Sequence, residues 1–290
     1  MTDNIKVKPS LSDQGVQVAT DDIGGTHYPI YKHAFGAEDS VALVSDANPL
    51  PVTATLSVDP IEIARGNVTG YSRVNKFGQN AALNSSTYED LWDGGGTYTY
   101  PTDGTAPITH IDSSSASDTE DIEVQGLDIN GTLTVQTITL TGTTIAALTT
   151  PLWRCFRLKN VGSVDLVGTA QAVNAADTVI YAQIAIGNNQ TLMALYTIPL
   201  GKTGALIRMQ VSMDGTNRAV AASGRIRARA YGGVFQLKST FGADSDGGSH
   251  TEEYPYPDTF AALTDIRADA IGSTNTISIN CRFTILLIDD

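Results

Sequence analysis

Hydrophobic and polar residues alternate along most of the second half of the chain, and this alternation sets the expected fold. The clearest example runs from Ile122 to Leu140, where two alternating segments flank Asn130-Gly131. Asn-Gly between such segments indicates a two-residue β-hairpin, because a type I′ turn requires positive φ at both central residues. The phase shifts at Gln125-Gly126 and again at Gln136-Thr137, and we expect a bulge or a strand break at each place.

Further strand-like segments follow at short intervals and are separated by Gly, Asn and Asp. They cover residues 153–158, 164–167, 179–186, 191–198, 205–213, 224–231, 234–237 and 276–288. Strands at this spacing indicate a sandwich or barrel, and eight or nine of them in one body suit a jelly roll. We predict an all-β fold, a jelly-roll-like antiparallel β-sandwich, with one helix near residues 260–270.

The first part of the chain has a different character. Residues 21–52 contain Gly24-Gly25 and three prolines, and their apolar residues follow no sustained period. Ordering such a segment costs about 1–2 kcal/mol per residue, so we expect residues 1–60 to form an extended arm with short strands, ordered against a neighbouring surface. A flexible tail is the alternative, although tails rarely carry so many aromatic residues.

A connecting segment, residues 61–107, joins this arm to the body at 108–290. We expect a short strand at 61–63 and one helical turn at 88–92, capped by Ser85 or Ser86. The segment also carries an aromatic loop with Tyr88, Trp92, Tyr98 and Tyr100. These rings, and those of the segment Tyr254-Pro-Tyr256-Pro, suit packing over the end of a sandwich; the alternative is that they stack on sugars.

Charge and cysteine content narrow the class of protein. The 290 residues carry a net charge of −13 and have a pI near 4.6, which argues against a nucleic-acid partner. Neither a secretory signal nor a membrane-spanning apolar segment is evident, so we expect synthesis in the cytoplasm and no membrane partner. Cys155 and Cys281 lie in apolar strand-like segments, which favours buried reduced thiols over a disulfide.

No pattern of residues indicates catalysis. The acidic clusters give no identifiable glycosidase pair, and the four histidines lack metal-ligand spacing. Asp244, Asp246 and Glu252 resemble a calcium loop only faintly, because the spacing of an EF-hand is missing. We therefore expect no catalytic residues, no metal site and no cofactor.

The most informative charges are Arg225, Arg227 and Arg229, which alternate with Ile226 and Ala228. At period two, the three arginines share one face of one strand. They form either a solvated outer face or a contact surface for an acidic neighbour, since arginine forks onto carboxylates and favours interfaces. We take them as interface candidates, together with three aromatic residues of the arm, Tyr28, Tyr31 and Phe35.

Residues 18–52 resemble the N-terminal segment of virion structural proteins of tailed bacteriophages. The shared pattern is D-x-I-x-G-x-x-Y-x-x-x-K, carried here by Asp21, Ile23, Gly25, Tyr28 and Lys32. The Thr- and Gly-rich body looks, more generally, like the jelly-roll modules of phage head decoration, head-fibre and tail proteins. This resemblance implies a non-enzymatic component present in many copies in the virion.

The expected function is therefore that of a capsid decoration or cement protein. The expected partners are the major capsid protein or other virion proteins, and further copies of the chain, most simply in a homotrimer. A tail or fibre protein that binds host-surface glycans is the alternative. A carbohydrate-active enzyme has only the analogy of fold in its favour.

Overall fold

The computed structural model describes residues 59–214, 220–245 and 249–290, together with the backbone of five short strands within residues 4–43. The chain divides into two units, Met1–Ser57 and Val58–Asp290. Each unit is described here by itself.

The first unit contains two small antiparallel sheets. One is formed by β1 (Asn4–Val7), β2 (Val16–Ile23) and β3 (Thr26–Pro29), and the other by β4 (Ala34–Phe35) and β5 (Ala42–Leu43). The remainder of this unit lies outside the described residues, as does the predicted extended course of the arm.

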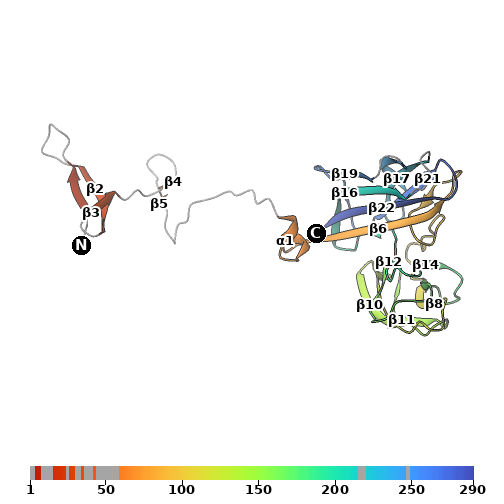
Figure 1. The fold of residues 1–290 in the computed structure, drawn as a ribbon. Helices are drawn as coiled ribbons and strands as arrows, with labels where there is room; N and C mark the ends of the chain where they lie inside the picture. The colour runs from red at the N-terminus through yellow and green to blue at the C-terminus, as the bar shows by residue number, and fades with distance from the viewer. Residues whose placement is uncertain are drawn as a thin grey trace. The chain divides into compact units, whose positions relative to one another are not determined.

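The second unit is built around a jelly roll of two facing antiparallel sheets (Figure 1). One sheet has the order β19-β16-β22-β6, and the other has the order β15-β21-β17-β18. The strands, in chain order, are β6 (Tyr71–Leu83), β15 (Leu195–Thr197), β16 (Lys202–Asp214), β17 (Ala221–Arg229), β18 (Gln236–Asp244), β19 (Ser249–Glu253), β21 (Asp265–Gly272) and β22 (Ile277–Asp289). Counted one to eight, they form sheets 6-3-8-1 and 2-7-4-5, which is the jelly-roll order. The predicted fold class is confirmed.

Alternating burial along the strands explains why the two sheets pack together. In β22, Ile279, Phe283 and Ile285 are fully buried, while Arg282 between them is exposed. Ile226 of β17 faces the same core from the opposite sheet. Each fully buried side chain of this size stabilises the fold by about 1.5–3 kcal/mol through removal of apolar surface from water.

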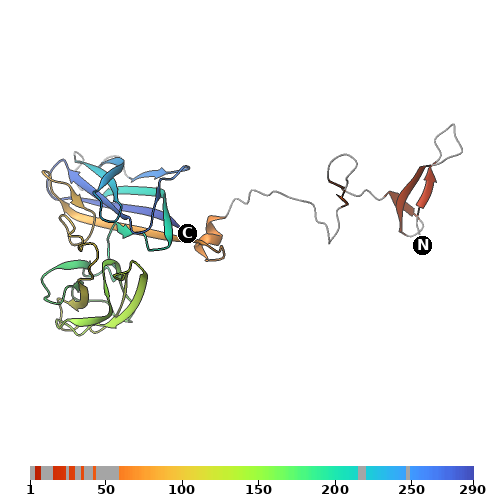
Figure 2. The same ribbon diagram turned by 180° about the vertical axis from the view of Figure 1, so that it is seen from behind.

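A second β lobe is inserted between β7 (Glu89–Asp90) and β15, and we call it the inserted lobe (Figures 1 and 2). Its strands are β8 (Ile108–Ser113), β9 (Asp121–Leu127), β10 (Leu133–Thr139), β11 (Ala146–Leu152), β12 (Arg154–Asn160), β13 (Ala170–Val173) and β14 (Ile180–Ile184). They form the sheets β10-β9-β12 and β11-β8-β13-β14. Ile111, Val124 and Leu158 belong to a core that is distinct from that of the jelly roll.

The boundaries of the jelly roll therefore differ from those expected from sequence, which placed a connecting segment at 61–107 and the whole sandwich at 108–290. The segment 61–107 supplies β6, which pairs along its length with β22 from the far end of the chain. Residues 108–184 form the inserted lobe rather than the first part of the sandwich.

The hairpin at Asn130-Gly131 is present, but its turn is not the expected one. Among the two central residues only Gly131 has a positive φ, of 78°. Gly131 N–H donates to the Asp128 carbonyl at 3.0 Å, and Asp128 Oδ1 accepts from the backbone N–H of Asn130 and Thr132. The aspartate fixes a longer loop, so that a single left-handed residue suffices.

Of the two irregularities expected in this hairpin, the one at Gln136-Thr137 is absent, and the one at Gln125-Gly126 does not interrupt the pairing of the hairpin itself. Strands β9 and β10 pair without interruption from Leu127↔Leu133 to Asp121↔Thr139. A bulge does occur opposite Gln125-Gly126, on the other edge of β9, where the register with β12 shifts between Cys155 and Arg157.

Three local predictions are corrected. Residues 61–63 belong to α1 (Pro60–Ala64), because Asp59 caps the helix with a 2.8 Å bond to Ile61 N–H and Pro60 stands at its start. Residues 89–90 form β7, which pairs with β21. The helix expected near 260–270 is replaced by β20 (Thr259–Phe260) and β21, because tertiary pairing overrides the helix propensity of alanine.

The structure also bears on the state of the two cysteines and on membrane-spanning helices. Cys155 and Cys281 are free and buried, as expected, and burial raises the pKa of each thiol to about 12. No helix in the part of the chain that the structure describes is long and apolar enough to span a membrane.

Candidate functional site

The three predicted arginines lie on the outer face of sheet β15-β21-β17-β18. On the same face, three charged residues of the neighbouring strand β21 lie next to them. The antiparallel register places Arg225 beside Asp269, Arg227 beside Arg267, and Arg229 beside Asp265. Side chains with a period of two share one face of a sheet, so all six project together. With Asp90, Asp103 and Arg154 they form what we call the arginine–aspartate cluster.

Hydrogen bonds within the cluster run between neighbouring strands. Arg225 Nε donates to Asp269 Oδ1 at 2.8 Å, and Arg227 forms an ion pair with the same carboxylate. Arg267 Nη1 donates to Asp90 Oδ2 at 3.0 Å, from the adjoining strand β7. Asp269 is 1% exposed, so its charge depends on these guanidinium groups for compensation.

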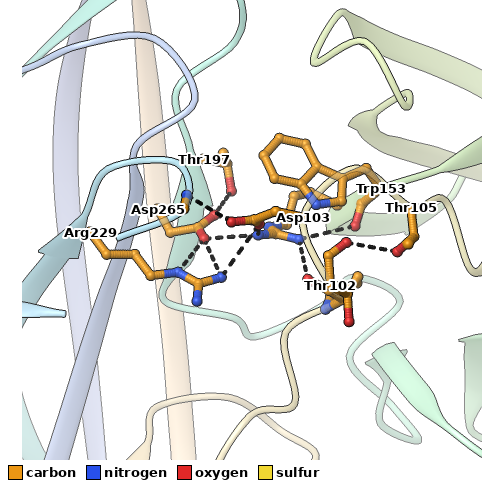
Figure 3. Close-up of polar contacts among 10 residues, drawn as sticks. Thr102, Asp103, Thr105, Trp153, Thr197, Arg229 and Asp265 are labelled. Carbon is orange, nitrogen blue, oxygen red and sulfur yellow. Dashed lines mark hydrogen bonds and ion pairs between the residues drawn. The ribbon is translucent and has the colours of Figure 1, made fainter. Parts of the chain in front are cut away.

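Asp265 is the centre of the second half of the cluster (Figure 3). Arg229 Nε donates to its Oδ2 at 2.8 Å, and the Thr197 hydroxyl donates to its Oδ1 at 2.6 Å. Arg154, the first residue of β12 in the inserted lobe, donates through Nε and Nη2 to both Asp265 oxygens at 2.9 Å. Arg154 Nη2 also donates to Asp103 Oδ1 at 2.8 Å. The Asp265 carboxylate therefore ties the inserted lobe to the jelly roll.

Aromatic rings cover the guanidinium groups. Arg225 lies 3.4 Å from the centroid of Tyr88, and Arg267 lies 4.2 Å from that of Phe235. Arg154 lies 3.9 Å above Trp153, and Tyr100 lies 4.8 Å from Arg229. These contacts cover part of the guanidinium surface and add attraction between cation and ring.

Burial sets the protonation behaviour of the cluster. Burial raises the pKa of Asp90 to about 6, although the Arg267 charge and the Tyr98 N–H favour its ionised form. Burial acts to lower the pKa of Arg154, but the hydrogen bonds and charge of Asp265 outweigh it, so this pKa is raised. The cluster is thus a compensated ionic network in which Arg154 keeps its charge.

Asp93, a partly buried carboxyl group outside the cluster, also has a strongly shifted pKa. Burial raises the pKa of Asp93 to about 7, against hydrogen bonds that include one from Leu192 N–H. Asp93 lines a cavity of about 250 Å³ with amide side chains such as Asn80 and Asn188. Among the described residues that line this cavity it is the single ionisable one, whereas glycoside hydrolysis uses two carboxyl groups.

The structure places the predicted site residues in two groups. Arg225, Arg227 and Arg229 are 25%, 21% and 19% exposed, and the carboxylates they pair with belong to their own chain. A contact between these arginines and an acidic neighbour stays a prediction. Tyr28 lies in β3 and Phe35 in β4, but their side chains, and the whole of Tyr31, lie outside the described residues.

The sequence analysis did not identify Asp265 and Asp269, the acidic partners of these arginines. The signal was present, since Asp265, Arg267 and Asp269 also recur at period two. It was hidden by the helix expected over the same residues.

The aromatic loop packs as the simpler interpretation proposed. Trp92 and Tyr98 are 7% and 4% exposed and meet edge to face, with ring centroids 5.2 Å apart. Tyr256, in contrast, is 97% exposed. Within the described ranges there is no group of three or more His, Cys, Asp or Glu residues placed to hold a metal ion. Asp246, one residue of the faint calcium-like pattern, lies outside those ranges.

The sequence and the structure were compared with protein families, curated proteins and solved structures. No protein-family model and no curated protein matches the chain. Among solved structures, the chain is similar to the VP2 protein in the crystal structure of an infectious bursal disease virus VP2 subviral particle, with 10% sequence identity and a TM-score of 0.22. The match covers 76% of this chain and 72% of that one. A TM-score this low carries no functional conclusion.

Proposed function

We propose that this chain is a non-enzymatic structural component of a tailed-phage particle, and specifically a capsid decoration or cement protein. The observation that carries the proposal is the division of the chain. A unit comprising residues 1–57, which contains the phage-like segment 18–52, precedes a jelly roll whose long strands all lie in residues 58–290. The protein would be made in the host cytoplasm and incorporated into the virion.

Exposed apolar residues around the β9–β10 hairpin support a role in association. Ile129, Leu133 and Val135 are 54%, 51% and 55% exposed. Leu200, 55% exposed, lies at the same turn, where its N–H donates to the Gly131 carbonyl at 2.8 Å. Grouped exposed apolar side chains are typical of protein–protein contacts. The partners we propose are the major capsid protein or other virion proteins, and two further copies of the chain in a trimer.

The experiment is to delete residues 1–57 and follow incorporation into particles. The truncated chain should remain folded by circular dichroism and thermal melting, because both hydrophobic cores lie in the second unit, yet it should no longer join particles. Normal incorporation of the folded truncated chain would refute the proposed role of the first unit.

A tail or fibre protein that binds host glycans is the second candidate. The fully exposed ring of Tyr256, between Pro255 and Pro257, favours it, since exposed aromatic rings supply contact area at binding surfaces. A glycan array probed with the intact protein discriminates the two functions. Reproducible binding that is lost in Tyr256→Ala supports the second candidate, and an array without binding supports the first.

A further inference from the structure

Three arginines from three neighbouring strands line one depression on the outer face of sheet β19-β16-β22-β6. They are Arg73 of β6, Arg208 of β16 and Arg282 of β22, and all three are exposed. The depression has a volume of about 140 Å³, and its other lining residues are Asn75, Gln210 and Thr284. Its lining contains no carboxylate.

The sheet register brings these side chains together. Arg282 pairs with Gln210, Arg208 pairs with Thr284, and Thr284 in turn pairs with Asn75. Neighbouring strands lie about 4.8 Å apart, so outward-facing residues in register sit side by side. The residues between them in sequence, such as Phe283 and Met209, are fully buried in the core and fix which face the arginines occupy.

These arginines differ from those of the arginine–aspartate cluster in having little acidic compensation. Within the described residues, neither Arg73 nor Arg282 forms an ion pair, and Arg208 is 4.0 Å from an exposed Glu253. An exposed ion pair at that separation is screened by solvent and contributes little. The chain as a whole has 31 acidic and 18 basic side chains, and against that excess the lining of this depression holds three arginines and no carboxylate.

A partly buried hydrogen bond holds the side chain of Asn75 beside these arginines. The Thr284 hydroxyl, in a side chain 8% exposed, donates to Asn75 Oδ1 at 2.7 Å. The amide oxygen thus accepts a hydrogen bond, and the NH₂ group of Asn75, a residue that lines the depression, supplies only donors.

Arg73 and Asn75 also line a larger cleft of about 430 Å³, which borders the inserted lobe. Gln125 and Arg157 line this cleft from β9 and β12, and Arg157 Nη2 donates to the Asn75 carbonyl at 2.8 Å. The cleft likewise has no carboxylate in its lining. A ligand larger than a single anion could therefore extend from the depression into this cleft, where Arg157 supplies a further positive charge.

We propose that this depression binds a tetrahedral oxyanion, a sulfate or phosphate group, whether free or carried by a saccharide. Guanidinium forks match the oxygens of such groups, and a dianion offsets the repulsion among three arginines better than one carboxylate does. The inference stands independently of the proposed structural function, because it uses only the residues of this face.

The test is isothermal titration calorimetry of the intact protein with sodium sulfate, sodium phosphate and a sulfated dextran oligosaccharide, at constant ionic strength. Arg73→Gln and Arg282→Gln each remove one cation from the depression. Arg65→Gln is the control, because it removes the same charge from an exposed side chain at the C-terminal cap of α1. Both site variants alter exposed side chains, and circular dichroism verifies that they fold.

We expect saturable binding of sulfate and phosphate by the wild type and by Arg65→Gln. Each site variant should bind about tenfold more weakly or worse, since it loses a charge-assisted hydrogen bond to the anion. Tighter binding of the sulfated oligosaccharide than of free sulfate would assign the group to a saccharide, and equal affinity would assign it to the free ion.

Two results overturn the proposal. One is the absence of saturable binding, or binding that both site variants retain. The other is preferential binding of a hexaglutamate peptide over all three probes with the same dependence on Arg73 and Arg282, which would identify the face as a site for an acidic polypeptide.

Discussion

Arg154 and Asp265 form a two-bond ion pair that joins the inserted lobe to the jelly roll. Both bonds measure 2.9 Å, and both side chains are 3% exposed. Their positions are 111 residues apart in the chain. Arg154 is the first residue of β12 and Asp265 is the first residue of β21, so the pair joins the starts of these two strands. An ionic contact between buried groups thus fixes one lobe against the other.

Replacing Asp265 with Asn should destabilise the protein strongly. The change leaves Arg154 and Arg229 without their shared anion, and removing one partner of a buried ion pair costs about 3–5 kcal/mol. Urea unfolding measures the loss. Glu62→Gln is the control, because Glu62 belongs to the exposed pair with Arg65, and its loss should cost less than about 1 kcal/mol. Equal effects of the two changes would show that Asp265 does not hold the lobes together.

Asp93→Asn should stabilise the protein increasingly as the pH rises. The pKa of Asp93 is raised to about 7 in the folded state, compared with about 3.9 in an unfolded chain. Folding therefore favours the protonated carboxyl, and the stability it contributes at low pH is lost as the pH rises through 7. Between pH 5 and pH 8 the advantage of the variant should grow by about 1–3 kcal/mol.

Urea unfolding at both pH values measures this difference. The exposed Asp258 provides the control, because its replacement by Asn removes the same kind of carboxyl group from a solvated position. An advantage of Asp93→Asn that is the same at pH 5 and pH 8 would contradict the assignment.

Gly78→Ala should be among the most damaging single-atom additions to the jelly roll. A Cβ at Gly78 would lie 2.0 Å from the Leu91 carbonyl oxygen and 2.2 Å from the Ala194 backbone nitrogen. Backbone atoms cannot move aside cheaply, so we expect a loss of about 3 kcal/mol or failure to fold. Gly242→Ala in β18 is the matched control, with no atom within 4 Å of the added carbon. Thermal unfolding of the pair tests the prediction, which fails if both variants melt alike.

Leu133→Asp combined with Val135→Asp should reduce incorporation into particles while leaving the isolated protein stable. Both side chains are more than half exposed on β10, so the folded monomer loses little when they become polar. Val234→Asp alters another exposed apolar residue, 77% exposed, in the loop between β17 and β18. Incorporation of this control should be normal. Equal incorporation of both variants would show that the hairpin face is not a contact surface.

The sequence predicted the fold class well because burial in a sandwich imposes a period of two. The segment 276–288 shows this: its alternation corresponds to the buried Ile279, Phe283 and Ile285 of β22. The inserted lobe was not predicted, because its strands have the same local pattern as those of the jelly roll. What separates them is non-local pairing, such as that of β6 with β22, which leaves no local signal.

The arginine–aspartate cluster was half predictable. Arg225, Arg227 and Arg229 were identified by their spacing, but their neighbours on β21 become evident only once the register of two distant strands is known. The alanines between the charges of β21 favour a helix by propensity, yet Ala268 and Ala270 are fully buried in the sandwich. Small side chains in a strand let the facing sheet approach closely. The helix propensity of alanine does not include this packing contribution.

The central claim, that this chain is a structural component of a phage particle, is tested most directly by electron cryo-microscopy of purified particles from cells that produce it. The account predicts repeated density on the particle that fits the jelly roll and inserted lobe of residues 58–290. Purified particles that lack the chain, while the lysate contains it in folded form, would contradict the account.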